Sequence, residues 1–134
     1  VPYYPLGYPL FVGFLYKLCG CEKIVVVCTQ IILCFFSIMT MFFLASFCFN
    51  NTVATIATIF MTFNLGNLVF AQFILAETIL SFLLLLFFTQ MMRFFNAYDV
   101  YDLFLAGIVL GFSVLFKPAA LYYPLILSLI IFFV

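Results

Sequence analysis

Long apolar runs follow one another along this sequence with only short polar breaks between them. The first such run covers residues 24–47, and later breaks lie near residues 50, 77, 99 and 117. An α-helix needs roughly 20 apolar residues to cross the ~30 Å hydrocarbon core of a bilayer, and several of these runs approach that length. The pattern therefore predicts membrane-spanning helices, and the lipid bilayer is the expected partner of the chain.

The composition leads to the same conclusion. Hydrophobic residues make up 70% of the chain and charged residues 6%, whereas soluble domains carry about 25% charged residues. Within lipid only helices and closed barrels satisfy their backbone, and these runs lack the alternation of barrel strands. We therefore expect an all-α fold, a polytopic transmembrane helix bundle with a short interfacial helix at its N-terminal end.

The polar breaks divide residues 1–134 into segments of a single transmembrane domain. The expected segments are an interfacial segment at 3–19 and spans at about 24–47, 53–75, 78–95, 103–116 and 121–134. Prolines and glycines break up the first segment, so we expect a short helix over residues 10–18 at the interface, with tyrosines at the headgroup level. Thr52 is the expected N-cap of the second span, and Pro118 favours a turn before the last one.

Alternating spans sort the charged residues onto two sides of the membrane. One side receives Lys17, Glu22, Lys23, Glu77 and Lys117, whereas the other receives Arg93, Asp99 and Asp102. An ionisable residue at a membrane edge can be a solvated helix end without further function. An acid and a base that converge beside an aromatic interfacial segment can also hold a charged headgroup.

Several other features exclude or weaken whole classes of function. The formal net charge is zero and the sequence has no histidine, which argues against nucleic-acid binding and against the commonest metal ligand. Cys19 and Cys21 form a C-x-C pair, but no second pair completes a metal or redox site, so ordinary cysteines are the favoured interpretation. Asn64 and Asn67 share one helical face and suit either hydrogen bonds between helices or the lining of a cavity.

Three stretches resemble segments of the GT-C membrane glycosyltransferases, which include protein mannosyltransferases and the aminoarabinose transferases of lipid A. PLGYPLF at residues 5–11 is similar to their P-x-x-Y-P-L-(F/L) segment, and AET at 76–78 is similar to a loop between two spans. LAGIVLG at 105–111, running to LFKP at 115–118, resembles their L-x-G-x-x-x-G pattern with its following K/R-P. The order and spacing of the three match, and together they cover most of the chain.

The resemblance implies a function and a set of site residues. Such enzymes sit in the bacterial inner membrane or an equivalent one, and use a polyprenyl-phosphate sugar donor on the extracytoplasmic side. Lys117 would bind the donor phosphate, Glu77 would orient a sugar hydroxyl, and Tyr8 would complete the substrate-binding set. A divalent metal in the full-length enzyme is an open alternative to a cationic side chain for stabilising the charge on the leaving phosphate.

The family's principal catalytic acid lies upstream of the P-x-x-Y-P segment, and this chain begins after that point. We therefore interpret the chain as an internal fragment of a longer protein and expect it to be inactive alone. Counting Lys and Arg places the Lys117 side in the cytoplasm, opposite to the orientation that the resemblance implies. The rival class is a non-enzymatic membrane protein, either a transporter fragment or a scaffold subunit, for which no inverted repeat is evident.

Overall fold

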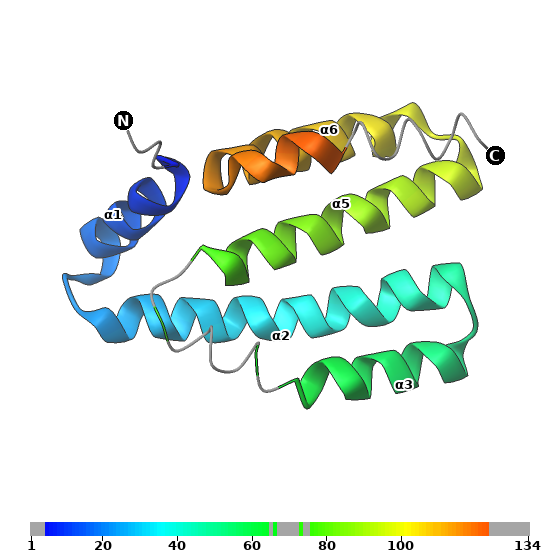
Figure 1. The fold of residues 1–134 in the computed structure, drawn as a ribbon, viewed down its shortest axis with the longest axis horizontal. Coiled ribbons are helices and arrows are strands. Elements are labelled where there is room, and N and C mark those ends of the chain that lie inside the picture. Colours follow the sequence, from blue (N-terminus) through cyan, green and yellow to red (C-terminus); the bar gives the residue numbers. More distant parts are fainter. Residues whose placement is uncertain (1–4, 65, 67–72, 74–75, 124–134) are drawn as a thin grey trace.

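The computed structural model describes residues 5–64, 66, 73 and 76–123, and every regular element among them is a helix. The elements are α1 (Gly7–Cys19), α2 (Lys23–Cys48), α3 (Asn51–Thr62), α5 (Glu77–Ala97), α6 (Val100–Phe116) and the 3-10 helix η1 (Pro118–Tyr122). The all-helical expectation is confirmed for this part of the chain. Helices α3, α2, α5 and α6 lie side by side in that order, and α1 lies across one end of the row (Figure 1).

Helix α1 begins at Gly7, before the expected start at residue 10, and therefore includes Pro9. Pro9 lies in the first turn of this helix, where the missing N–H has no helical partner to lose, so the helix tolerates it. The helix ends at Gly20, whose φ of 97° is a backbone conformation that glycine adopts at little cost. This turn connects α1 to the start of α2.

Two short turns join the neighbouring long helices. Asn50 caps α3 because its Oδ1 accepts a hydrogen bond from the backbone N–H of Val53 at 2.9 Å, so the prediction of Thr52 as the N-cap was wrong. The extended backbone that a cap requires falls at Asn50 and not at Thr52, which lies inside the first turn. Between α5 and α6, Tyr98 adopts a left-handed conformation with φ of 54°, and Asp99 caps α6 by accepting from the N–H of Tyr101 at 3.0 Å.

The helix ends can be compared with the expected segments only in part. Helices α2 and α5 cover the expected segments 24–47 and 78–95, and α6 covers 103–116 with one more turn at its start. Helix α3 ends at Thr62, and most of the remaining stretch up to residue 75, including Asn67, lies outside the described residues. The same holds for nearly all of the segment 121–134. At the expected break, Lys117 is extended and Pro118 starts η1.

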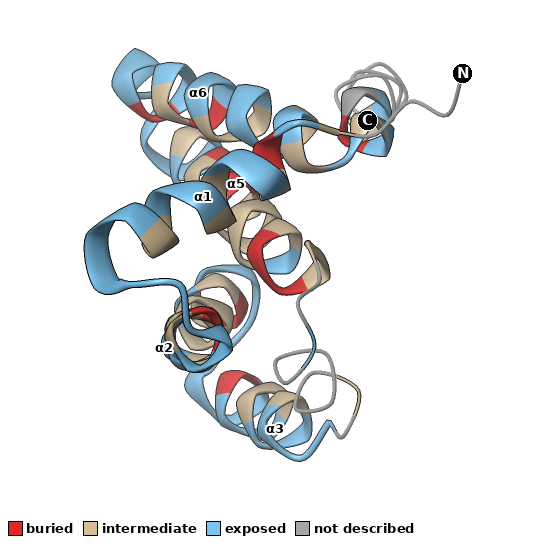
Figure 2. Cartoon of the chain, turned by 90° about the vertical axis from the view of Figure 1, so that its left-hand side faces the viewer, coloured by how far each residue is buried: buried red, intermediate tan, exposed pale blue. Residues whose placement is uncertain are grey.

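The distribution of burial differs from that in a water-soluble protein, because many large apolar side chains lie on the outside. Large apolar side chains cover the outside of the described helices, with Phe60, Phe104 and Leu10 each more than 60% exposed. The buried set contains polar side chains between the helices, namely Gln30, Ser37, Thr78, Asp102 and Ser113. Figure 2 shows this arrangement as red patches that face the neighbouring helices and blue outer surfaces. The small apolar core between α5 and α6 is formed by Phe87, Met91 and Ala106.

Two of the described helices, α2 with 26 residues and α5 with 21, are long and apolar enough to cross a membrane. At 1.5 Å per residue they are about 39 and 32 Å long, against a hydrocarbon core of about 30 Å. Helices α3 and α6 are apolar but shorter.

Candidate functional site

The start of α5 and the end of α6 meet at one end of the helix row because the two helices are antiparallel neighbours (Figure 1). Glu77 is the first residue of α5, and Lys117 directly follows the last residue of α6. Their side chains form an ion pair, with 3.6 Å between the Lys117 Nζ and the Glu77 Oε1. The two residues that counting of spans assigned to one end of the bundle are thus in direct contact.

Tyr8 belongs to the same end of the bundle and is held there by a buried amide. Gln30 of α2 is 0% exposed, and its Nε2 donates a hydrogen bond to the Tyr8 hydroxyl at 3.1 Å. Burial raises the pKa of Tyr8 to about 12; the Gln30 hydrogen bond opposes this shift, and nearby Tyr16 and the negative charge of Glu77 add to it. The phenol therefore keeps its proton at neutral pH and can donate a hydrogen bond.

Close contacts between α1 and the end of α6 fix the position of Tyr8. A Cβ atom added at Gly7 would lie 2.6 Å from the backbone C and O of Leu115, so the helices approach more closely than any side chain would allow. One turn further along α1, the ring of Phe11 meets the ring of Phe116 edge-on, with 6.3 Å between their centroids. Both contacts lie beside Lys117, and they bring the Tyr8 hydroxyl to the end of the bundle where the ion pair is formed.

The ion pair is accessible to a ligand. The side chain of Lys117 is 50% exposed and that of Glu77 is 44% exposed. Ion pairs this exposed contribute about 0–1 kcal/mol, so an incoming anion can displace the carboxylate at small cost. The site offers one ammonium group, one carboxylate and one neutral phenol, which suits an anionic headgroup joined to a hydroxylated group.

Within the described residues, no group of three or more His, Cys, Asp or Glu side chains could hold a metal ion. Glu77 lies at this end of the bundle, and Glu22 lies at the turn before α2. Residues 5–64, 66, 73 and 76–123 therefore provide no set of ligands for the divalent metal considered above. Cys19 and Cys21 are exposed free thiols at the turn after α1.

Arg93 and Asp102 occupy the opposite end of the α5–α6 pair, where the Arg93 Nε lies 3.4 Å from the Asp102 Oδ1. Asp102 is buried, with 4% of its side chain exposed, whereas Arg93 is half exposed. This pair is separate from the site around Glu77 and Lys117. Asn64 instead makes a local turn, since its Oδ1 accepts from the N–H of Gly66 at 3.0 Å.

Gln30 is the residue of this site that the sequence interpretation missed. It lies inside residues 24–47, which were treated as one apolar span without further distinction. A lone amide inside such a span is costly to leave unpaired, and this cost is the signal that would have singled it out.

Comparison of the chain with models of protein families, with curated proteins and with solved structures finds no match.

Proposed function

We propose that the chain is part of a multi-pass membrane glycosyltransferase that transfers a sugar from a polyprenyl-phosphate-linked donor to an acceptor on the extracytoplasmic side. The observation that carries the proposal is the contact of 3.6 Å between Lys117 and Glu77, beside the protonated phenol of Tyr8. These three residues are also those that the GT-C resemblance assigns to the substrate. The placement in a membrane and the chemistry at the site have separate support.

The membrane placement is supported by the many large apolar side chains on the outer surface of the described helices. Exposed phenylalanine and leucine side chains would be a liability in water, but acyl chains cover them at no cost. The hydroxyls of Thr40 and Thr55 on outer surfaces donate to backbone carbonyls one turn back, at 2.8 Å each. A hydroxyl satisfied within its own helix suits a surface that faces hydrocarbon.

The chemistry of the site follows from how charge moves during sugar transfer. The phosphate that links sugar and polyprenyl chain carries one negative charge, and it gains a second as the bond to the sugar breaks. An ammonium group beside it stabilises the transition state more than the ground state. Lys117 supplies this group once the phosphate displaces Glu77, and the released carboxylate can then accept a hydrogen bond from a sugar hydroxyl. The Tyr8 phenol, protonated at neutral pH, can donate to a phosphate oxygen.

Sugar transfer by the full-length protein in membranes tests the proposal. Lys117→Ala should slow transfer by about a hundredfold, since losing one such contact costs on the order of 3 kcal/mol. Lys117→Arg should be milder because the charge persists, and Glu77→Gln should also slow transfer. Expression and thermal unfolding, followed in parallel, separate loss of the site from loss of the fold. Transfer at the parent rate by both Lys117→Ala and Glu77→Gln would show that the site assignment is wrong.

The multi-pass topology has its own test. Single cysteines placed at Glu77 and at Arg93, in a background without the five native cysteines, should react with a membrane-impermeant thiol reagent from opposite sides. Equal labelling of both positions from one side would contradict the topology.

A further inference from the structure

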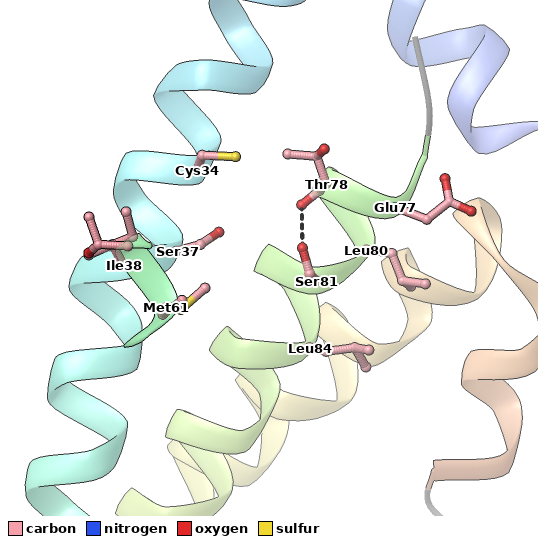
Figure 3. Close-up of a pocket in the computed structure, with 10 residues that line it drawn as sticks. Cys34, Ser37, Ile38, Met61, Glu77, Thr78, Leu80, Ser81 and Leu84 are labelled. Atoms are coloured by element: carbon pink, nitrogen blue, oxygen red, sulfur yellow. Dashed lines mark hydrogen bonds between the residues drawn. The ribbon is translucent and has the colours of Figure 1, made fainter. Parts of the chain in front are cut away.

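A cavity of about 290 Å³ lies between α2, α3 and α5 and is distinct from the ion-pair site. Figure 3 shows its walls, with Ser37 of α2 facing Ser81 of α5 and with Met61 of α3 at one side. Glu77 borders the cavity, but its carboxylate points away from Thr78 toward the end of α6, where it pairs with Lys117 (Figure 3). No charge of the ion pair is therefore directed into this space.

The hydroxyl groups on the wall have a defined hydrogen-bonding capacity. Ser37 donates its proton to the backbone oxygen of Leu33 at 2.8 Å, and Ser81 donates to the backbone oxygen of Thr78 at 2.9 Å. Both serine oxygens keep lone pairs that can accept a hydrogen bond. The wall thus presents acceptors whose own donors are already used.

Thr78 adds the missing donor. Its side chain is buried, and its Oγ1 has no hydrogen-bond partner among the described residues. Its methyl group points toward α2 (Figure 3). Rotation by one staggered χ1 step would move the hydroxyl to the place now held by the methyl, and the methyl to the place of the Cβ hydrogen. A partner there would remove the cost of about 1–3 kcal/mol that an unpaired buried hydroxyl carries.

The remaining lining restricts the ligand further. Ile38, Met61 and Leu84 are apolar, so most of the surface offers no hydrogen bonds. The volume corresponds to about ten groups of the size of a water molecule, at the lower end of the range for ligand sites. A neutral ligand with one hydroxyl group and a short length of hydrocarbon meets all of these conditions.

We propose that this cavity binds the hydroxyl end of a neutral single-chain lipid alcohol that enters from the surrounding acyl chains. The Thr78 hydroxyl donates to the alcohol oxygen, the alcohol proton goes to Ser37 or Ser81, and the first methylenes pack against Ile38 and Leu84. The inference uses the membrane placement proposed above but not the sugar transfer.

Photolabelling of the full chain in phosphatidylcholine vesicles tests the inference, with hexadecanol that carries a diazirine close to its hydroxyl as the probe. The label should be saturable, should map to the parts of α2, α3 and α5 that line the cavity, and should be displaced by unlabelled hexadecanol. Hexadecyl phosphate should displace it poorly because no Lys or Arg is among the described residues that line the cavity. Saturable labelling elsewhere only, or equal displacement by hexadecyl phosphate, would overturn the assignment.

Two isosteric variants of α5 provide the matched comparison. Thr78→Val should weaken displacement by hexadecanol about fivefold, the equivalent of one neutral hydrogen bond of ~1 kcal/mol. Thr89→Val should leave it unchanged, because the Thr89 hydroxyl donates to the Leu85 carbonyl at 2.7 Å and does not line the cavity. Thr78→Val removes only an unpaired hydroxyl, so thermal unfolding should show an intact fold. Equal binding by the two variants would refute the role of Thr78. Sugar transfer by Thr78→Val at the parent rate would show that alcohol binding is independent of the proposed transfer activity.

Discussion

The side-chain amide of Gln30 donates a hydrogen bond to the hydroxyl of Tyr8 at 3.1 Å, and this bond joins α1 to the N-terminal part of α2, a long apolar helix. The two residues are 22 positions apart in the sequence. Because Gln30 is fully buried, water cannot replace Tyr8 as its partner. The bond therefore helps to position α1 relative to the ion pair of Glu77 and Lys117.

A double-mutant cycle of Gln30→Leu and Tyr8→Phe should measure the strength of this bond. We expect a coupling free energy of about 0.6–1.5 kcal/mol, the range for side-chain hydrogen bonds inside membrane and soluble proteins. Unfolding by dodecyl sulfate in mixed micelles gives the four stabilities. A coupling near zero would mean that the two helices are held together by apolar contacts alone.

Gly7→Ala should destabilise the protein by about 1–3 kcal/mol, the usual cost of forcing extra volume into a packed contact. The added Cβ would lie 2.6 Å from the Leu115 backbone, which cannot move aside as a side chain could. Gly13→Ala is the control on the same helix, because no described atom lies within 4 Å of an added Cβ there. It should be neutral or stabilising by up to about 1 kcal/mol. Equal effects of the two variants on unfolding would contradict the close approach.

Arg93→Ala should reduce stability more than Lys117→Ala. Removal of Arg93 leaves the carboxylate of Asp102 buried and without its counter-ion, which should cost about 1–3 kcal/mol. Removal of Lys117 leaves Glu77 half exposed to solvent or headgroups, which should cost less than about 1 kcal/mol. Parallel unfolding measurements would show the order. The reverse order would mean that the Glu77–Lys117 pair stabilises the fold more than the Arg93–Asp102 pair does.

The stability of the folded chain should fall as the pH rises from about 10 to about 12. The pKa of Tyr8 is raised from 10.0 to about 12 in the folded state, so the unfolded state loses this proton first. In that window the folded state binds more protons, and alkaline conditions therefore favour unfolding. Tyr8→Phe should show a shallower pH dependence than the parent. Identical slopes for parent and Tyr8→Phe would contradict the raised pKa.

The helical class and the ends of several helices follow from local sequence. Apolar runs with no polar alternation can satisfy their backbone in lipid only as helices, and the polar breaks at residues 22–23, 50–51 and 98–99 coincide with turns. Because consecutive helices joined by short turns are antiparallel, counting them also predicted that Glu77 and Lys117 come together. Neither prediction required knowledge of which side chains touch.

The contacts that build the site were decided only by the tertiary structure. The G-x-x-x-G spacing of Gly107 and Gly111 allows close helix approach. However, no described atom lies within 4 Å of an added Cβ at either position, and the close approach is found at Gly7 instead. Hydropathy assigns residues to lipid-compatible helices but carries no information on which faces meet. The backbone of Gly7 touches Leu115, and Gln30 meets Tyr8, because packing matches the shapes and hydrogen-bonding groups of residues far apart in the chain.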